Sequence, residues 1–190
     1  EIMGINDKKE LAQAEKILQD RLRDKFLKKG VTMIDPDTVY LSTDTKIGKD
    51  VTIYPNVFIG GNVSISSGVM IYPFSHLENC RIENKVEIGP YTRIRPGTIL
   101  KEGSKVGNFV EIKKSTVGKK SKVNHLTYIG DTSIGRSVNI GAGTITCNYD
   151  GIKKNKTKIK DNVFIGSNSS LVAPLTLEEN SIVGAGSVIT

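Results

Sequence analysis

The sequence has no tryptophan, and its 190 residues include only two histidines and two cysteines. Cys80 and Cys147 are too few and too far apart for a disulfide framework, so we expect a reducing, cytoplasmic setting. Nowhere do about 18 apolar residues follow one another, and we therefore expect neither a membrane-spanning helix nor a membrane partner. These absences argue against a disulfide-rich secreted domain and against a membrane-embedded protein.

The scarcity of histidine and cysteine also limits metal binding. His76 and His125 cannot supply the three ligands of a three-histidine zinc site, and the cysteines form no Cys-x-x-Cys pair, so we expect no metal. The neighbours of His76 are unremarkable, and we interpret it as structural. His125 lies in "KVNHLTYIG" (122–130), where a structural role and that of a base titrating near neutral pH both fit.

Acidic residues are fewer than basic ones, 20 against 27, which gives a net charge of +7. Such a charge permits an anionic partner and is equally typical of a solvated basic surface. The basic runs at 111–122 and 151–160 lack the interleaved aromatic residues of a single-strand nucleic-acid platform. We therefore expect no nucleic-acid partner.

Residues 6–30 are predicted to form one helix. Asn6 or Asp7 can cap it, Glu10 can complete a capping box, and Gly30 can end it. One apolar stripe is expected to dock on the rest of the protein, and it consists of Leu11, Ala14, Ile17 or Leu18, and Leu22. Residues 33–38 are expected to form a turn-rich linker.

From Ile47 onward an aliphatic residue recurs every sixth position, with three steps of five, and a second column of mostly small residues follows four places later. This period fits neither a helix nor an alternating strand, but it is typical of a β-helix in which three hexapeptides make one coil. Residues 47–190 would then form about eight coils. The pattern is lost between Ile140 and Ile159, so residues 147–157 are predicted to project as a loop.

Since three hexapeptides make one coil, residues eighteen positions apart lie above one another, and this places Arg95 and Lys113 in one column on adjacent coils. They are eighteen residues apart with no five-residue step between them. Their backbones should therefore lie roughly 4.8 Å apart, where two cations repel each other unless an anion lies between them. Splaying into solvent and binding a phosphate both remain compatible with this geometry.

Several long segments resemble one family of hexapeptide-repeat acyltransferases. They are "YTRIRPG" (91–97), "GNFVEIKKS" (107–115), "HLTYIGD" (125–131), "VNIGAGTITCNYDG" (138–151) and "VFIGSNSSLVAP" (163–174). The resemblance is to the acetyltransferase domain of the bacterial bifunctional N-acetylglucosamine-1-phosphate uridyltransferase/glucosamine-1-phosphate acetyltransferase. It implies a mainly β fold, a left-handed parallel β-helix preceded by an N-terminal α-helix. Residues 1–38 would end the uridyltransferase domain and form the connecting helix, and 39–190 would form the acetyltransferase domain.

The resemblance also implies an activity and the residues that carry it. His125 matches the general base that takes a proton from the 2-amino group of glucosamine-1-phosphate, so that the nitrogen can attack acetyl-CoA. Glu111 lies where a carboxylate could orient that histidine. The implied sugar-phosphate contacts are Arg95, Lys113, Tyr128, Asn139 and Lys154. The implied acetyl-CoA contacts are Ala142, Asn148, Tyr149, Ser167 and Ala185.

The family forms homotrimers with active sites between subunits, which we expect here as well. Magnesium would serve only the uridyltransferase domain, of which Asn6 resembles one metal contact. Asn124 stands where the family has a small residue, and the family continues past Thr190 into a tail with a basic residue near the CoA. Two other functions remain as alternatives: acyl transfer to another sugar nucleotide, and a non-catalytic trimerisation scaffold.

Overall fold

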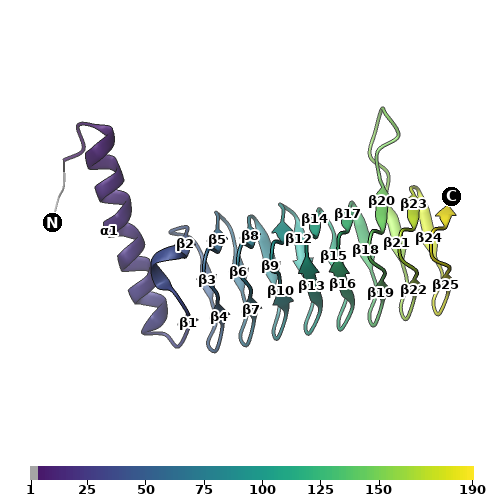
Figure 1. Cartoon of the computed structure of the whole chain (residues 1–190), viewed down its shortest axis with the longest axis horizontal. Helices are drawn as coiled ribbons and strands as arrows, with labels where there is room; N and C mark the ends of the chain where they lie inside the picture. The colour runs from purple at the N-terminus through teal and green to yellow at the C-terminus, as the bar shows by residue number, and fades with distance from the viewer. Residues whose placement is uncertain (1–3) are drawn as a thin grey trace.

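The computed structural model describes residues 4–190, so residues 1–3 of the expected segment 1–38 lie outside the described residues. One helix, α1 (Lys8–Leu27), stands at one end of a long three-sided parallel β-helix (Figure 1). Asp7 caps α1 by accepting the N–H of Glu10 at 2.8 Å, and the Glu10 carboxylate accepts the N–H of Asn6 at 2.6 Å. The helix ends at Leu27, before Gly30, which has a φ of 85°.

The apolar stripe predicted for α1 was largely wrong. Leu11, Ile17 and Leu18 are exposed, and the buried residues of α1 are Gln19, Leu22, Arg23 and Phe26. The reason is that the helix covers an open sheet edge, where unpaired backbone groups need hydrogen bonds. The side-chain amide of Gln19 donates to the carbonyl of Leu41 at 2.8 Å and accepts its N–H at 2.9 Å.

The three faces of the β-helix are parallel sheets, which we call A, B and C. Sheet A contains β1 (Thr32–Met33), β4 (Thr52–Ile53), β7 (Met70–Ile71), β10 (Glu87–Ile88), β13 (Lys105–Asn108), β16 (Lys122–His125), β19 (Asn139–Ile140), β22 (Phe164–Ile165) and β25 (Ile182–Val183). Sheet B contains β2 (Tyr40–Leu41), β5 (Phe58–Ile59), β8 (His76–Leu77), β11 (Arg93–Ile94), β14 (Glu111–Lys113), β17 (Tyr128–Gly130), β20 (Ile145–Cys147), β23 (Ser170–Val172) and β26 (Val188–Ile189). Sheet C contains β3 (Lys46–Ile47), β6 (Ser64–Ile65), β9 (Cys80–Ile82), β12 (Thr98–Leu100), β15 (Thr116–Val117), β18 (Thr132–Ile134), β21 (Thr157–Ile159) and β24 (Leu175–Leu177).

Both predicted columns point inward and form the core. Ile53, Ile59 and Ile71 are at most 1% exposed, as are Val51 and Val57 of the second column. The 24 strands from β3 to β26 make eight coils of three, as predicted, and β1 and β2 precede them. Because β1 pairs with β4, the β-helix already begins within the segment expected to be a linker, while the domain boundary at 38/39 stays a prediction.

The irregular steps of the repeat share one corner, between sheets B and C, which we call the B/C edge. The three five-residue steps all connect a strand of sheet B to one of sheet C, at Leu77 to Ile82, Ile112 to Val117 and Ile129 to Ile134. The insertion lies there too, because residues 148–156 connect β20 to β21. They project from the β-helix as a loop closed by an antiparallel bridge between Tyr149 and Lys154, as predicted (Figure 1).

Candidate active site

His125 heads a column of predicted acetyl-CoA contacts along the corner between sheets A and B, which we call the A/B edge. It ends β16, and the parallel register of β16, β19, β22 and β25 places Ala142, Ser167 and Ala185 at the same position of the next three coils. The coils approach closely here, since a Cβ added at Gly141 would lie 2.5 Å from the backbone nitrogen of Ser167. The structure thus aligns the candidate base with three small residues.

Asn108, which the sequence analysis missed, holds the His125 ring. Its side-chain oxygen lies 2.7 Å from His125 Nδ1, and the two residues are register partners in β13 and β16. When Nδ1–H donates to this oxygen, the lone pair of Nε2 is left to accept a proton. Stacking arithmetic could have found Asn108, because it lies one coil before His125 in the same column.

Asn124, adjacent to the base, fits between two glycines. It is register partner to Gly107 on one coil and to Gly141 on the other. A Cβ at Gly107 would lie only 2.1 Å from the carbonyl oxygen of Asn124, so the close approach of the coils requires glycine there. The half-buried Asn124 side chain therefore has space that a larger neighbour would remove.

Glu111 has a different partner from His125 within this chain. Its carboxylate accepts a hydrogen bond from Arg95 Nη1 at 2.7 Å, whereas the partner of His125 is Asn108. Glu111 is the first residue of β14 on sheet B, beside Tyr128 of β17. Within one chain Glu111 therefore positions Arg95, and its expected role toward His125 stays a prediction.

Arg95 and Lys113 lie on adjacent coils as predicted, and Lys154 joins them from the loop. The register of β11 and β14 pairs Ile94 with Ile112, so the residues that follow are neighbours at the B/C edge. The ammonium of Lys154, loss of solvation and the charge of Arg95 together lower the pKa of Lys113, while Asp131 opposes the shift. Three cations that disfavour one another in this way form a site that an anion would stabilise.

The loop that carries Lys154 is held by its own polar groups. Asp150 accepts the N–H groups of Lys153 and Ile152 and the side-chain amide of Asn155, and these bonds lower its pKa to about 2. Two loop residues predicted to contact acetyl-CoA also bond locally. Asn148 donates to the Asp131 carboxylate at 2.6 Å, and the Tyr149 hydroxyl donates to the carbonyl of Gly151 at 2.6 Å.

A single chain does not bring all the predicted residues together. The A/B edge carries His125, Ala142, Ser167 and Ala185, whereas sheet B and the B/C edge carry Glu111, Tyr128, Arg95, Lys113, Asn148, Tyr149 and Lys154. Asn139 lies on sheet A, between Lys122 and Phe164 in register. The base and the cation cluster therefore occupy opposite edges of sheet B.

Among residues 4–190 no group of three or more His, Cys, Asp or Glu side chains is placed to hold a metal ion. Asn6 lies just before α1 with its N–H on Glu10, and its expected magnesium role stays a prediction. In the same described range, no helix combines the length and apolar character needed to cross a membrane.

The repeat profile described as bacterial transferase hexapeptide (six repeats) matches residues 79–114 and 156–190, which include much of the cation cluster and the end of the A/B column. The chain therefore carries hexapeptide repeats similar to those of bacterial transferases. Its fold is the left-handed parallel β-helix that the resemblance implied, and it is mainly β with one N-terminal helix.

Similar curated proteins match the chain from end to end. It is 53% identical over 190 residues to the bifunctional protein GlmU of Zymomonas mobilis and 51% identical over 189 residues to that of Wolbachia pipientis. All of this chain is covered in both comparisons, but only 42% and 44% of those proteins. The chain thus spans less than half the length of the relatives it matches.

Solved structures show the same fold at low identity. A UDP-N-acetylglucosamine acyltransferase matches with a TM-score of 0.53 at 19% identity, covering 78% of this chain and 71% of that one. The UDP-N-acetylglucosamine O-acyltransferase of Moraxella catarrhalis matches with a TM-score of 0.50 at 14% identity, covering 78% and 66%. These likenesses concern the fold alone.

Proposed function

We propose that this chain transfers the acetyl group of acetyl-CoA to the 2-amino group of glucosamine-1-phosphate. The observation that carries the proposal is the A/B column, in which His125, oriented by Asn108, stands in line with Ala142, Ser167 and Ala185. Small side chains leave backbone groups accessible along this edge, where an extended acyl carrier could lie. The end-to-end similarity to bifunctional GlmU proteins supports the same assignment.

The residues suit acyl transfer to an amine. In the proposed reaction, Nε2 of His125 accepts a proton from the 2-amino group, and the nitrogen lone pair attacks the thioester carbonyl. A new amide bond forms, the carbon–sulfur bond breaks, and the thiolate of CoA leaves and takes up a proton. A positioned general base typically contributes about 10²–10⁴-fold to such a rate, and holding the two substrates together contributes further through proximity.

In the proposal, the cation cluster binds the phosphate of the sugar. Arg95 is held by Glu111 at 2.7 Å, and the Lys113 pKa is lowered by the neighbouring Lys154 and Arg95. A phosphate placed among these groups would be bound by Arg through a planar fork and by the lysines as point charges. It would also raise the Lys113 pKa, because an anion stabilises the charged ammonium.

We further propose that the active form is a homotrimer. The base and the cation cluster lie on opposite edges of sheet B, so a site containing both requires a second chain. A ladder of exposed, stacked rings, Phe74, Tyr91 and Phe109, continues the A/B edge toward the N-terminus with centroids 4.8 and 5.2 Å apart. Exposed apolar patches of this kind mark interaction sites. Sedimentation as a monomer at micromolar concentration would contradict the trimer.

The decisive experiment measures thiol release from acetyl-CoA with glucosamine-1-phosphate by the parent, His125→Ala and His76→Ala. His76 is the matched control, since it stacks on Phe58 in sheet B with ring centroids 4.7 Å apart. We expect His125→Ala to lose about 10²-fold or more in kcat with circular dichroism unchanged. His76→Ala should retain activity.

Equal turnover by the parent and His125→Ala would overturn the assigned base. Absence of release by the folded parent trimer would instead favour the scaffold alternative. Mass spectrometry across a panel of aminosugars separates glucosamine-1-phosphate from another sugar nucleotide as the acceptor.

A further inference from the structure

A groove on sheet C lies outside the candidate active site. It has a volume of about 560 Å³ and runs across β15, β18, β21 and β24, beside the B/C edge. Successive strands are about 4.8 Å apart, so the groove extends over about 14 Å. These dimensions suit a small molecule, since binding pockets for such ligands measure roughly 300–1,000 Å³.

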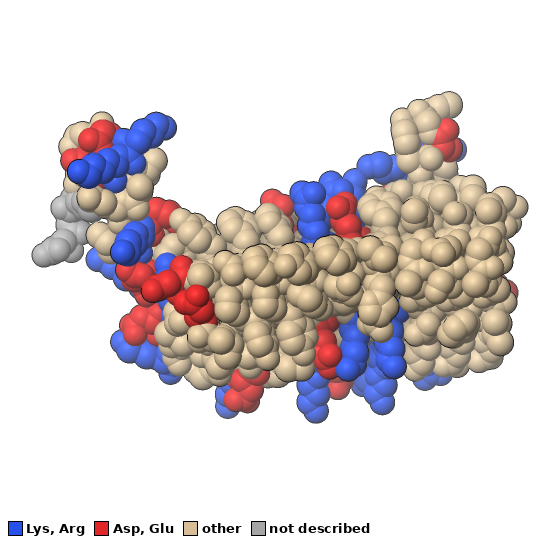
Figure 2. Space-filling model, viewed as in Figure 1, with Lys and Arg blue, Asp and Glu red and all other residues tan. Residues whose placement is uncertain are grey.

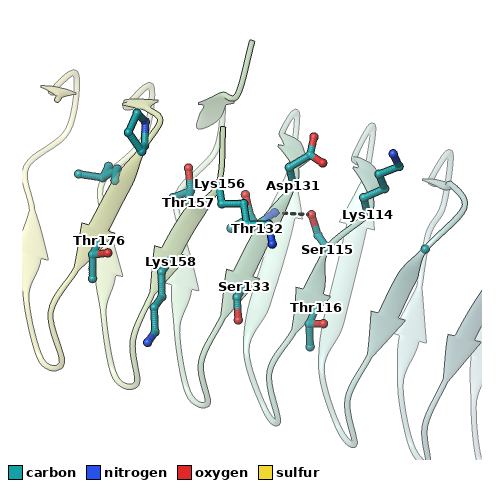
Figure 3. Close-up of a pocket in the computed structure, with 13 residues that line it drawn as sticks. Lys114, Ser115, Thr116, Asp131, Thr132, Ser133, Lys156, Thr157, Lys158 and Thr176 are labelled. Atoms are coloured by element: carbon teal, nitrogen blue, oxygen red, sulfur yellow. Dashed lines mark hydrogen bonds between the residues drawn. The ribbon is translucent and has the colours of Figure 1, made fainter. Parts of the chain in front are cut away.

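The floor and the rim of the groove differ in chemistry. Thr116, Ser133 and Thr176 stand in one row on the outward face of sheet C, with Lys158 between the last two (Figure 3). Lys114 and Lys156 flank the row from the B/C edge. A row of hydroxyls can both donate and accept hydrogen bonds, and the lysines supply only donors and positive charge.

The three groove lysines have no carboxylate partner within residues 4–190. Some cations on other coils do pair with carboxylates within 4.0 Å, as in Lys101–Glu83, Lys105–Glu87 and Lys119–Glu102. Of the groove residues only Asp131 is acidic, and its carboxylate already accepts a hydrogen bond from Asn148. The groove therefore has an excess of positive charge. On the side of the molecule shown in Figure 2, which is opposite to the side shown in Figure 3, charged side chains gather along the long edges and leave the surface between them largely uncharged.

A buried hydroxyl in the groove wall is left without a partner. Five hydroxyl residues begin sheet C segments at one register position, and three of them donate to carbonyls of sheet B strands: Thr98 to Ile112, Ser115 to Lys113 and Thr132 to Gly130. Thr45, at the first coil and outside the groove, is buried without a hydrogen-bond partner. The fifth, Thr157, follows the projecting loop and is the one that lies in the groove wall. It is 1% exposed, and its hydroxyl has no hydrogen-bond partner. Buried polar groups are nearly always paired, so Thr157 indicates a missing partner at this wall.

We propose that the sheet C groove is a second binding site, for a phosphorylated sugar, separate from the acetyl-transfer site. The lysines Lys114, Lys156 and Lys158 bind the phosphate, and the row of hydroxyls binds the sugar. The groove residues come from sheet C and the B/C edge, and none of them belongs to the A/B column (Figure 3). Lys156 and Lys154 belong to the same loop, so a ligand in the groove also contacts the segment that completes the cation cluster.

The test footprints the groove with a thiol placed in it by Ser133→Cys. The probe is glucose-1-phosphate, which lacks the reacting amine, and peptide mass spectrometry reads the modification rate of each cysteine separately. Native Cys80 gives little background, because burial raises its pKa to about 12. Ser64→Cys, exposed on the outward face of sheet C at β6, is the matched control outside the groove.

We expect glucose-1-phosphate to slow the modification of Ser133→Cys in a saturable way and to leave Ser64→Cys unaffected. Adding Lys158→Ala should weaken the protection about tenfold or more, and Lys158→Arg should retain it. Adding Arg95→Ala should leave it unchanged, which separates this groove from the proposed phosphate site. Protection that is absent, survives Lys158→Ala or disappears with Arg95→Ala would overturn the proposal. Equal protection by inorganic phosphate would overturn the role of the sugar.

Discussion

The hexapeptide repeat requires aliphatic residues inside and sets few conditions on the outward positions. A polar outward residue that bonds a second polar residue on the next coil is therefore informative. Asn108 and His125 form such a pair at 2.7 Å, and Glu111 and Arg95 form another at the same distance. Each pair orients one functional group, the imidazole of His125 or the guanidinium of Arg95, through a hydrogen bond that contributes nothing to packing in the core.

Replacing Asn108 tests the positioning of the base. In Asn108→Ala the ring of His125 loses its hydrogen bond, and we expect kcat to fall about tenfold or more with little change in KM. In Asn108→Asp the new carboxylate stabilises the imidazolium, so the acidic limb of the pH–rate profile should move to higher pH while activity partly returns. A merely structural role for Asn108 predicts no shift of the profile, and this outcome would contradict the assignment.

At the level of elements, the sequence predicted what the core dictates. The inward columns and the eight coils after Ile47 were predictable because inward positions repeat every six residues, and the loop was predictable because the repeat fails there. The buried face of α1 was not predictable from its apolar residues. Gln19 and Arg23 lie on that face, and their side chains donate hydrogen bonds to backbone carbonyls at the open edge of the first coil. The family resemblance named Glu111 but not the side chain that it contacts within the chain.

The loop of residues 148–156 depends on the ionised Asp150 carboxylate. Its pKa is lowered from 3.8 to about 2 by hydrogen bonds from Lys153, Ile152 and Asn155, so this support is present above pH 3.8 and is lost as the pH falls toward 2. We expect Asp150→Ala to raise the KM for the sugar phosphate about tenfold, because Lys154 loses its position. Limited proteolysis should then cut the loop faster.

Ile152→Ala is the control for the loop. Ile152 is 91% exposed at the loop tip, and its side chain takes no part in the bonds of Asp150. The loop of this variant should resist proteolysis as the parent does. Equal KM values for Asp150→Ala and the parent would show that loop order does not position Lys154.

At the scale of the whole molecule, the two groups of candidate site residues lie on different edges of the prism. The A/B edge carries the base and the small residues, and the B/C edge carries the cations and the loop. A three-sided prism cannot bring two of its edges together, so in the proposed trimer a complete site would form where the A/B edge of one chain meets the B/C edge of another. Closed rotational symmetry then gives every chain one such neighbour on each side.

Mixing two inactive variants tests this arrangement. In trimers reassembled from equal amounts of His125→Ala and Lys154→Ala, about a quarter of the sites should combine an intact His125 from one chain with an intact Lys154 from its neighbour. Thiol release should therefore return to about a quarter of the parent rate, although each variant alone is impaired. Mixing the doubly substituted chain with His125→Ala provides the control, because no intact His125 is present and no activity should return. If both residues of a site came from the same chain, the first mixture would stay as inactive as its components, and the intersubunit site would be refuted.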